Sequence, residues 1–101
     1  MDTLVLDKGI GTLNTHKDEW ARLPITEKIP LFQGVSKKTA EVAENWVAVA
    51  VKAKSIPESS PLVGEEWASG PWALIYGVES MVGSLQSLDK GKNPPIGKVR
   101  T

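Results

Sequence analysis

The most regular pattern of hydrophobic and polar positions runs from Thr26 to Lys54. One set of side chains recurs there at three- and four-residue spacing, which is the repeat of one face of an α-helix. This stripe consists of Phe32, Val35, Thr39, Val42, Ala43, Trp46, Ala50 and Ala53. We therefore predict a long helix with Thr26 as its N-cap and Pro30 within its first turns. A break at Glu44-Asn45 would divide it, so one bent helix and two successive helices both stay open.

The second half of this segment is apolar on more than one side. The residues responsible are Val42, Trp46, Val47, Val49, Ala50, Val51 and Ala53. A helix that is apolar most of the way round is buried from more than one direction. Because a two-helix hairpin covers only one side, the pattern predicts a further contact with another subunit.

The first 12 residues combine four large apolar side chains with two glycines, Gly9 and Gly11. Glycine disfavours a helix interior, so we expect a short strand here, or an arm that packs on another chain. A first helix is predicted from about Asn14 to Leu23. Pro24 ends that helix, because the residue before a proline avoids the α region.

The C-terminal half predicts a short helix and a longer one. Ser60-Pro61 is a typical helix start, with proline at the first helical position. Ser69-Gly70-Pro71 interrupts the pattern, and the main helix follows from about Pro71 to Asp89. Its apolar stripe is Leu74, Val78, Met81, Val82, Leu85 and Leu88, whereas Trp72 and Tyr76 project from roughly the opposite side.

These elements predict an all-α fold, a small bundle of three to four helices that dimerisation completes. We divide the chain into an N-terminal arm (1–12), a helical domain (13–89) and an extended C-terminal tail (90–101). A chain of 101 residues is expected to form one domain with a thin hydrophobic core. Surplus apolar surface is then expected at a contact between subunits, and the predicted oligomer is a homodimer.

Charge and cysteine content narrow the classes of function. Twelve basic and twelve acidic residues give a formal net charge of +0, which offers a polyanion no long-range attraction. Nucleic acid is therefore a poor candidate partner. A small regulator that uses the basic tail (Lys90, Lys92, Lys98 and Arg100) on nucleic acid is kept as a weaker alternative. Without cysteines, a secretory signal or an apolar run of the ~20 residues that span a bilayer, the chain is expected in the cytoplasm, with no membrane partner.

No group of residues has the spacing of a catalytic, cofactor or metal site. His16 is the only histidine, and zinc needs three or four N, S or O ligands. Glu65 and Glu66 are adjacent, so on a helix they point about 100° apart and do not converge. Gly9-Ile10-Gly11 and Gly91-Lys92 lack the other residues of a phosphate-binding loop. We therefore predict no catalytic residue, no cofactor, no metal ion and no enzyme activity for this chain alone.

The four tryptophans point to a contact surface. Trp46 and Trp67 fit the predicted core stripes, but Trp72 does not. Aromatic side chains on a second helix face are enriched at protein contacts. The candidate interface consists of Trp46, Val47, Val51, Trp67, Trp72 and Tyr76.

Several short stretches follow one another in a recognisable order. They are Glu19–Pro24 (Glu-Trp-Ala-Arg-Leu-Pro), Glu27-Lys28, Val51–Lys54 (Val-Lys-Ala-Lys) and Ser60–Trp67 (Ser-Pro-Leu-Val-Gly-Glu-Glu-Trp) with the helix after it. Over roughly residues 13–101 this order resembles the extreme N-terminus of the aldehyde dehydrogenase superfamily. Lys28 stands where arginine is common in that family, and Pro30 is unusual at its place.

That resemblance implies a layer of helices that packs on a cofactor domain. It carries over no catalytic residue, because the family's catalytic cysteine and glutamate base lie beyond this length. The first hypothesis is a non-catalytic helical module for interaction and oligomerisation. The alternative is one fragment of a split NAD(P)-dependent aldehyde dehydrogenase, with the cofactor and catalytic parts on a dehydrogenase-like partner chain.

Overall fold

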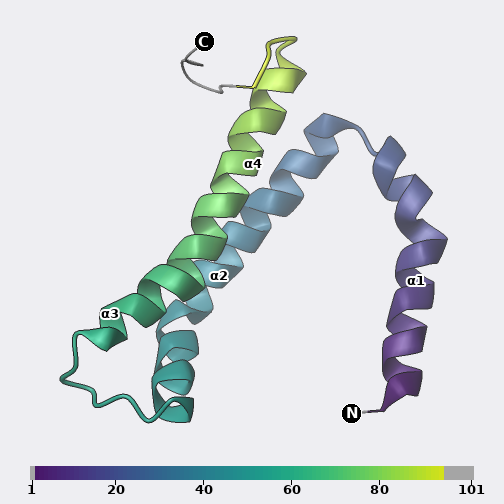
Figure 1. Ribbon diagram of the computed structural model, residues 1–101. Helices are drawn as coiled ribbons and strands as arrows, with labels where there is room; N and C mark the ends of the chain where they lie inside the picture. The colour runs from purple at the N-terminus through teal and green to yellow at the C-terminus, as the bar shows by residue number, and fades with distance from the viewer. Residues whose placement is uncertain (1, 95–101) are drawn as a thin grey trace, which may run out of the picture.

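The computed structural model describes residues 2–94, and short connections separate its helices (Figure 1). The elements are α1 (Thr3–Arg22), α2 (Ile25–Ala53), α3 (Leu62–Trp67), a π-helical turn (Ala68–Trp72) and α4 (Ala73–Asp89). The predicted all-α class is confirmed for this part of the chain. Within it, no helix is both long enough and apolar enough to cross a lipid bilayer.

Helix α1 begins at Thr3, well before the start predicted for the first helix at about Asn14. The Leu4 N–H donates to Asp2 Oδ1 at 2.9 Å, so Asp2 caps the helix by satisfying a free backbone donor. The prediction that glycine keeps residues 3–12 out of a helix is therefore wrong, because Gly9 and Gly11 lie inside α1. The helix crosses the arm boundary predicted at residue 12, and the division of the chain into arm, domain and tail stays a prediction. The end at Leu23, before Pro24, is confirmed.

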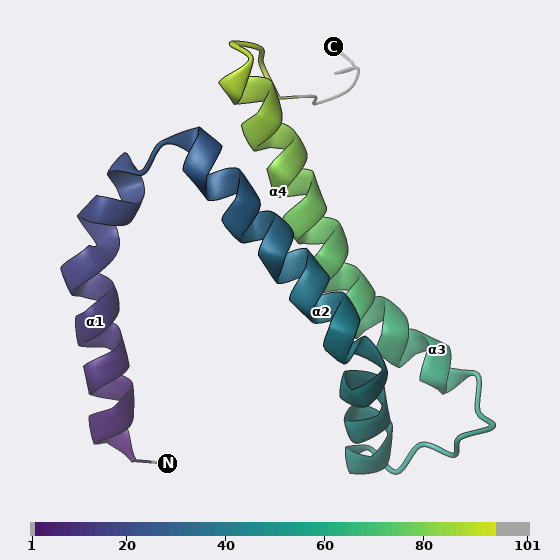
Figure 2. The same ribbon diagram turned by 180° about the vertical axis from the view of Figure 1, so that it is seen from behind.

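Helix α2 is one continuous helix, which decides between the two possibilities left open at Glu44-Asn45. Its axis bends in the C-terminal part (Figures 1 and 2). Pro24 takes the N-cap position, and Thr26 lies one residue inside the helix, so the predicted cap is wrong. Pro30 is near the start of the helix, where its missing N–H costs little.

The core lies between α2 and the kinked α3–α4 segment, which run side by side (Figures 1 and 2). The buried residues of α2 are Ser36, Thr39, Ala43, Val47 and Val51, and Val82 and Pro71 are buried on the opposing segment. Three of the α2 side chains are small, which lets the two helix backbones approach closely. The predicted stripe is buried only in part: Thr39 and Ala43 belong to this core. Its other members Val35, Val42 and Trp46 are exposed on a neighbouring face.

The predicted interruption at Ser69-Gly70-Pro71 is confirmed as a π-helical turn in which Gly70 has non-helical dihedral angles. At the predicted helix start, the Leu62 N–H donates to Ser60 Oγ at 3.2 Å. An ion pair of 2.7 Å between Lys54 Nζ and Glu66 Oε1 joins the end of α2 to α3. The kinked segment therefore folds back along α2 as a hairpin.

Helix α1 stands away from this hairpin (Figures 1 and 2). None of its residues is buried within the described part of the chain. Its side-chain contacts with α2 lie at the hinge, where Trp20 meets Phe32 edge to face at 5.9 Å and Lys28 Nζ lies 5.2 Å from the Trp20 ring. The radius of gyration is 18.1 Å, against about 13 Å for a compact chain of this length.

Candidate interaction surfaces

The exposed surface carries many large apolar side chains, and most of them lie in three places. We call Leu6, Ile10, Leu13 and Trp20 the α1 stripe. The outer groove is lined by Leu31, Val35, Val42, Trp46 and Leu74. The aromatic face consists of Trp67, Trp72 and Tyr76. Single exposed apolar residues are ordinary in proteins, but contiguous patches mark sites of interaction.

The α1 stripe follows one side of a helix that has few contacts. Its spacing alternates four and three residues from Leu6 through Ile10 to Leu13, and Trp20 continues it seven residues later. Leu6, Ile10 and Leu13 are 48%, 64% and 74% exposed. These three side chains leave a continuous apolar surface in contact with water.

The outer groove runs along α2 beside α4. It has a volume of about 590 Å³, and Gly34 forms part of its lining with Lys37 and Lys38 on the rim. Lys38 Nζ reaches Glu41 Oε2 at 3.4 Å. The groove is therefore shallow and mostly apolar, with two basic residues in its lining.

The aromatic face lies at the kink between α3 and α4. The rings of Trp72 and Tyr76 stack at 5.0 Å between centroids and 17° between planes, and the two residues are 60% and 61% exposed. Stacked aromatic side chains that stay exposed are typical anchors of protein contacts. The expectation that Trp72 and Tyr76 project together on one side of the helix is confirmed.

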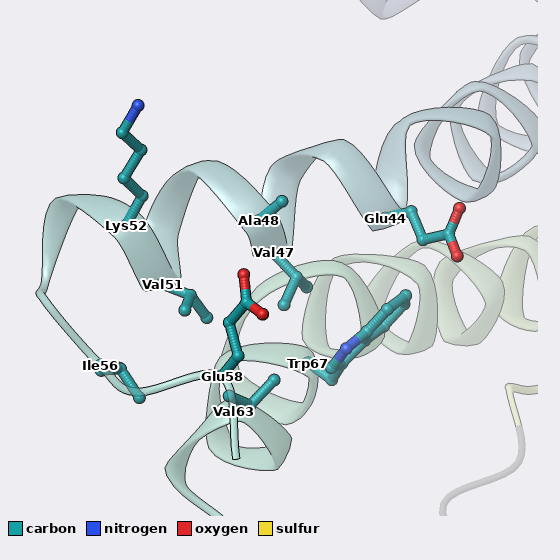
Figure 3. A pocket seen from close by; sticks show the side chains of 9 residues that line it. All are labelled: Glu44, Val47, Ala48, Val51, Lys52, Ile56, Glu58, Val63 and Trp67. Carbon is teal, nitrogen blue, oxygen red and sulfur yellow. The ribbon is translucent and has the colours of Figure 1, made fainter. Parts of the chain in front are cut away.

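Trp67 extends this face into a hollow between α2, the connection after it and α3 (Figure 3). The hollow has a volume of about 530 Å³. Its apolar walls come from Val47, Val51, Ile56, Val63 and Trp67, and Glu58 reaches over it while Lys52 points away. The hollow is thus lined mostly by apolar side chains, with the two carboxylates Glu44 and Glu58 among them. A mainly apolar lining with a few polar groups is the usual character of a binding pocket.

The six predicted interface residues fall into three groups, of which two meet at the hollow beside Trp67. Trp46 lines the outer groove, whereas Val47 and Val51 belong to the core, where only 4% and 8% of their surface is exposed. Trp67, Trp72 and Tyr76 form the aromatic face. Val47 and Val51 reach the surface only where they line the hollow beside Trp67. The interface role is therefore carried forward as a proposal for the exposed tryptophans and Tyr76.

Two of these surfaces include residues that sequence reasoning missed. The α1 stripe was not predicted, because the low helix propensity of Gly9 and Gly11 favoured a strand or an extended arm. The signal was nevertheless present in the 4-3 spacing of Leu6, Ile10 and Leu13. Leu31 and Leu74 meet in the outer groove only because α4 folds back along α2, which no local pattern reveals.

Side chains that could act as acids, bases or nucleophiles are dispersed over the described residues. His16 Nδ1 lies 3.1 Å from Glu19 Oε2, and both side chains are well exposed. The other bonded side-chain pairs within residues 2–94 are Lys38–Glu41 and Lys54–Glu66, so none of these pairs joins a hydroxyl to a base. No group of three or more potential metal ligands occurs in that range.

The C-terminal basic tail is described only in its first part. Lys90 and Lys92 follow α4, and the Lys92 N–H donates to Ser87 O at 2.8 Å. Lys98 and Arg100 lie outside the described residues. The hypothesis of a small regulator that uses this tail on nucleic acid stays a prediction.

Comparison of the chain with models of protein families, with curated proteins and with solved structures finds no match.

Proposed function

We propose that this chain is a non-catalytic helical module whose role is association, and that it pairs with a second copy of itself through the aromatic face. The observation that carries this proposal is the large apolar surface that the hairpin and α1 leave exposed. Trp72 and Tyr76 form the anchor, because a preordered stack loses little side-chain entropy on binding.

The amount of exposed surface supports a stable partner. The accessible area is 8249 Å², whereas a compact monomer of this mass exposes roughly 5,600 Å². Even half of this excess exceeds the ~800 Å² that each partner buries in a standard interface. An association that hides this area also removes apolar side chains from water. Burial of apolar surface contributes a favourable free energy of about 25 cal/mol per Å².

The resemblance to the N-terminal helices of aldehyde dehydrogenases is part of this proposal. It is supported by the order of a tryptophan-bearing helix, a Leu23-Pro24 turn, a long helix and a kinked helix in the fold. In such a relative, the helices form a layer that needs a covering partner. The activity of that family is not proposed for this chain.

The test is the mass of the full chain in solution, by light scattering or sedimentation at tens of micromolar. We expect about twice the chain mass of 10.9 kDa. The Trp72→Ala variant should weaken the dimer by about 30-fold or more, since a central aromatic anchor contributes about 2 kcal/mol. Because Trp72 is largely exposed, this change leaves the hairpin core intact.

The matched control is Asn45→Ala, an exposed position on α2 that lines none of the hollows. It should leave the dissociation constant unchanged. A chain that stays monomeric across this concentration range would refute the proposal, and equal affinity of the two variants would remove the aromatic face from it.

A further inference from the structure

The α1 stripe needs a covering surface that residues 2–94 do not provide. A helix in a protein gains most of its stability from packing its apolar face rather than from intrinsic propensity. Helix α1 also contains Gly9 and Gly11 in its interior, and glycine is among the weakest helix formers. A helix of this composition stays formed when another surface packs against Leu6, Ile10 and Leu13.

The outer groove has the spacing and length of that missing surface. Apolar positions on α1 step by four and three residues through Leu6, Ile10 and Leu13, and those on α2 step from Leu31 by four to Val35 and by seven to Val42. Both patterns repeat every seven residues, the geometry of helices that pack at a shallow angle. At 1.5 Å per residue, Leu6 to Leu13 and Val35 to Val42 each span roughly 10 Å, so the two repeats match in length.

The hinge keeps α1 away from the groove of its own chain. Leu23 and Pro24 both have extended backbone angles, with ψ of 131° and 146°, so this short connection separates the two helices. The Trp20 ring is held at the hinge by Phe32 and Lys28. As Figures 1 and 2 show, the N-terminal end of α1 lies far from α2.

A second copy of the chain can cover the α1 stripe and the outer groove at the same time. Each chain carries one stripe and one groove, so two chains related by a two-fold axis bury both stripes and both grooves in a closed pair. Such an exchange of helices also accounts for the exposed area of 8249 Å², because it adds two contacts to the one at the aromatic face. The short, extended hinge is typical of segments that exchange between protomers.

We infer that α1 is an exchanged arm, and that its stripe packs in the outer groove of a second copy of this chain. The inference rests on the proposed self-association and adds the surfaces that meet. Leu13 then lies beside the partner copy's groove residues, of which Val42 is near the middle.

Site-specific cross-linking tests this contact, because the chain contains no cysteine. Leu13→Cys and Val42→Cys are made in separate full-length chains, one of them isotopically labelled, then mixed and treated with a short bis-maleimide. We expect a mixed covalent dimer whose cross-link joins residue 13 of one chain to residue 42 of the other. Its yield should be at least about tenfold above the control, since thiols held together have an effective concentration on the order of millimolar.

The matched control replaces Leu13→Cys with Thr15→Cys. Residue 15 lies on the opposite side of α1, where the native Thr15 Oγ1 donates to Gly11 O. The mixed product should then fall to the level of random encounter. A double variant with Leu13→Cys and Val42→Cys in one chain reports whether α1 closes on its own groove.

Three results would decide against the exchange, and they differ from one another. In the double variant, a cross-link between residues 13 and 42 of the same chain would assign the groove to the chain's own α1. A dimer of the correct mass in which Leu13→Cys and Thr15→Cys give equal yields would end the inference and leave the proposed self-association standing. A chain that is monomeric in solution would refute both the helix exchange and the proposed self-association.

Discussion

Ser36 places a hydroxyl in the core between the helices without a partner. Its residue is 8% exposed, and Oγ is the buried side-chain oxygen or nitrogen within residues 2–94 that lacks a hydrogen bond. Burying an unpaired hydroxyl costs free energy, because water no longer satisfies it. Thr39 avoids this cost, since its Oγ1 donates to Val35 O at 2.7 Å.

Ser36→Ala should therefore raise the free energy of unfolding, by about 1 kcal/mol, because it removes the unpaired hydroxyl and improves helix propensity. Urea denaturation at a fixed chain concentration measures the change. Thr39→Val is the matched comparison: it keeps the shape of the side chain but loses a satisfied hydrogen bond, so it should bring no gain. A loss of stability in Ser36→Ala would show that the hydroxyl has a partner.

The kink between α3 and α4 depends on a close approach at Gly70. A Cβ added there would lie 3.3 Å from Trp46 Cε2, tight enough that the indole must move. The kink thus ties the start of α4 to the outer groove, because Trp46 lines that groove. Helix direction and groove shape are set by the same contact.

Gly70→Ala should lower the free energy of unfolding by about 1 kcal/mol, the low end of the cost of overpacking. Thermal or urea unfolding measures the change, and tryptophan fluorescence reports the displaced Trp46. Gly77→Ala in α4 serves as control, since no atom lies within 4 Å of the added Cβ. That change should instead stabilise by roughly 0.5–1 kcal/mol. Equal effects of the two substitutions would mean that the Trp46 contact is not limiting.

The whole molecule has a thin core for its length and mass. A single helix pair buries Ala43, Val47, Val51 and Val82, while α1 contributes nothing to that core. A monomer with this distribution gains little from burial, so its stability should depend on association. For proteins of this kind, the midpoint of unfolding rises with chain concentration.

We expect the midpoint of thermal unfolding to rise by roughly 5 to 10 °C when the chain concentration increases a hundredfold, as mass action predicts for a dimer of this size. Circular dichroism at both concentrations measures it. Trp72→Ala should unfold at a lower temperature than the unsubstituted chain at the same concentration. A midpoint of thermal unfolding that does not change with chain concentration would indicate a monomer that is stable without a partner.

Much of the helical architecture follows from local chemistry that can be read along the chain. Pro24 ends α1, Ser60-Pro61 opens α3, and Gly70-Pro71 breaks the helix that follows, because each acts on its immediate backbone neighbours. Trp72 and Tyr76 share a face since they lie four residues apart where the π-helical turn leads into α4 with helical backbone angles. Residues 3–12 were mispredicted because glycine propensity is a weak signal, which the Asp2 cap and the helix beyond it outweigh.

The face of α2 that is buried was determined only by the packing of α4. The apolar arc of α2 spans more than one side, so periodicity leaves open which part of it meets another helix. Ser36, Thr39 and Ala43 lie on the part of α2 that is buried. Val35, Val42 and Trp46 are therefore left outside to form a groove. Spacing along the chain fixes which residues share a face, but their burial depends on a second helix whose position involves residues far away in sequence.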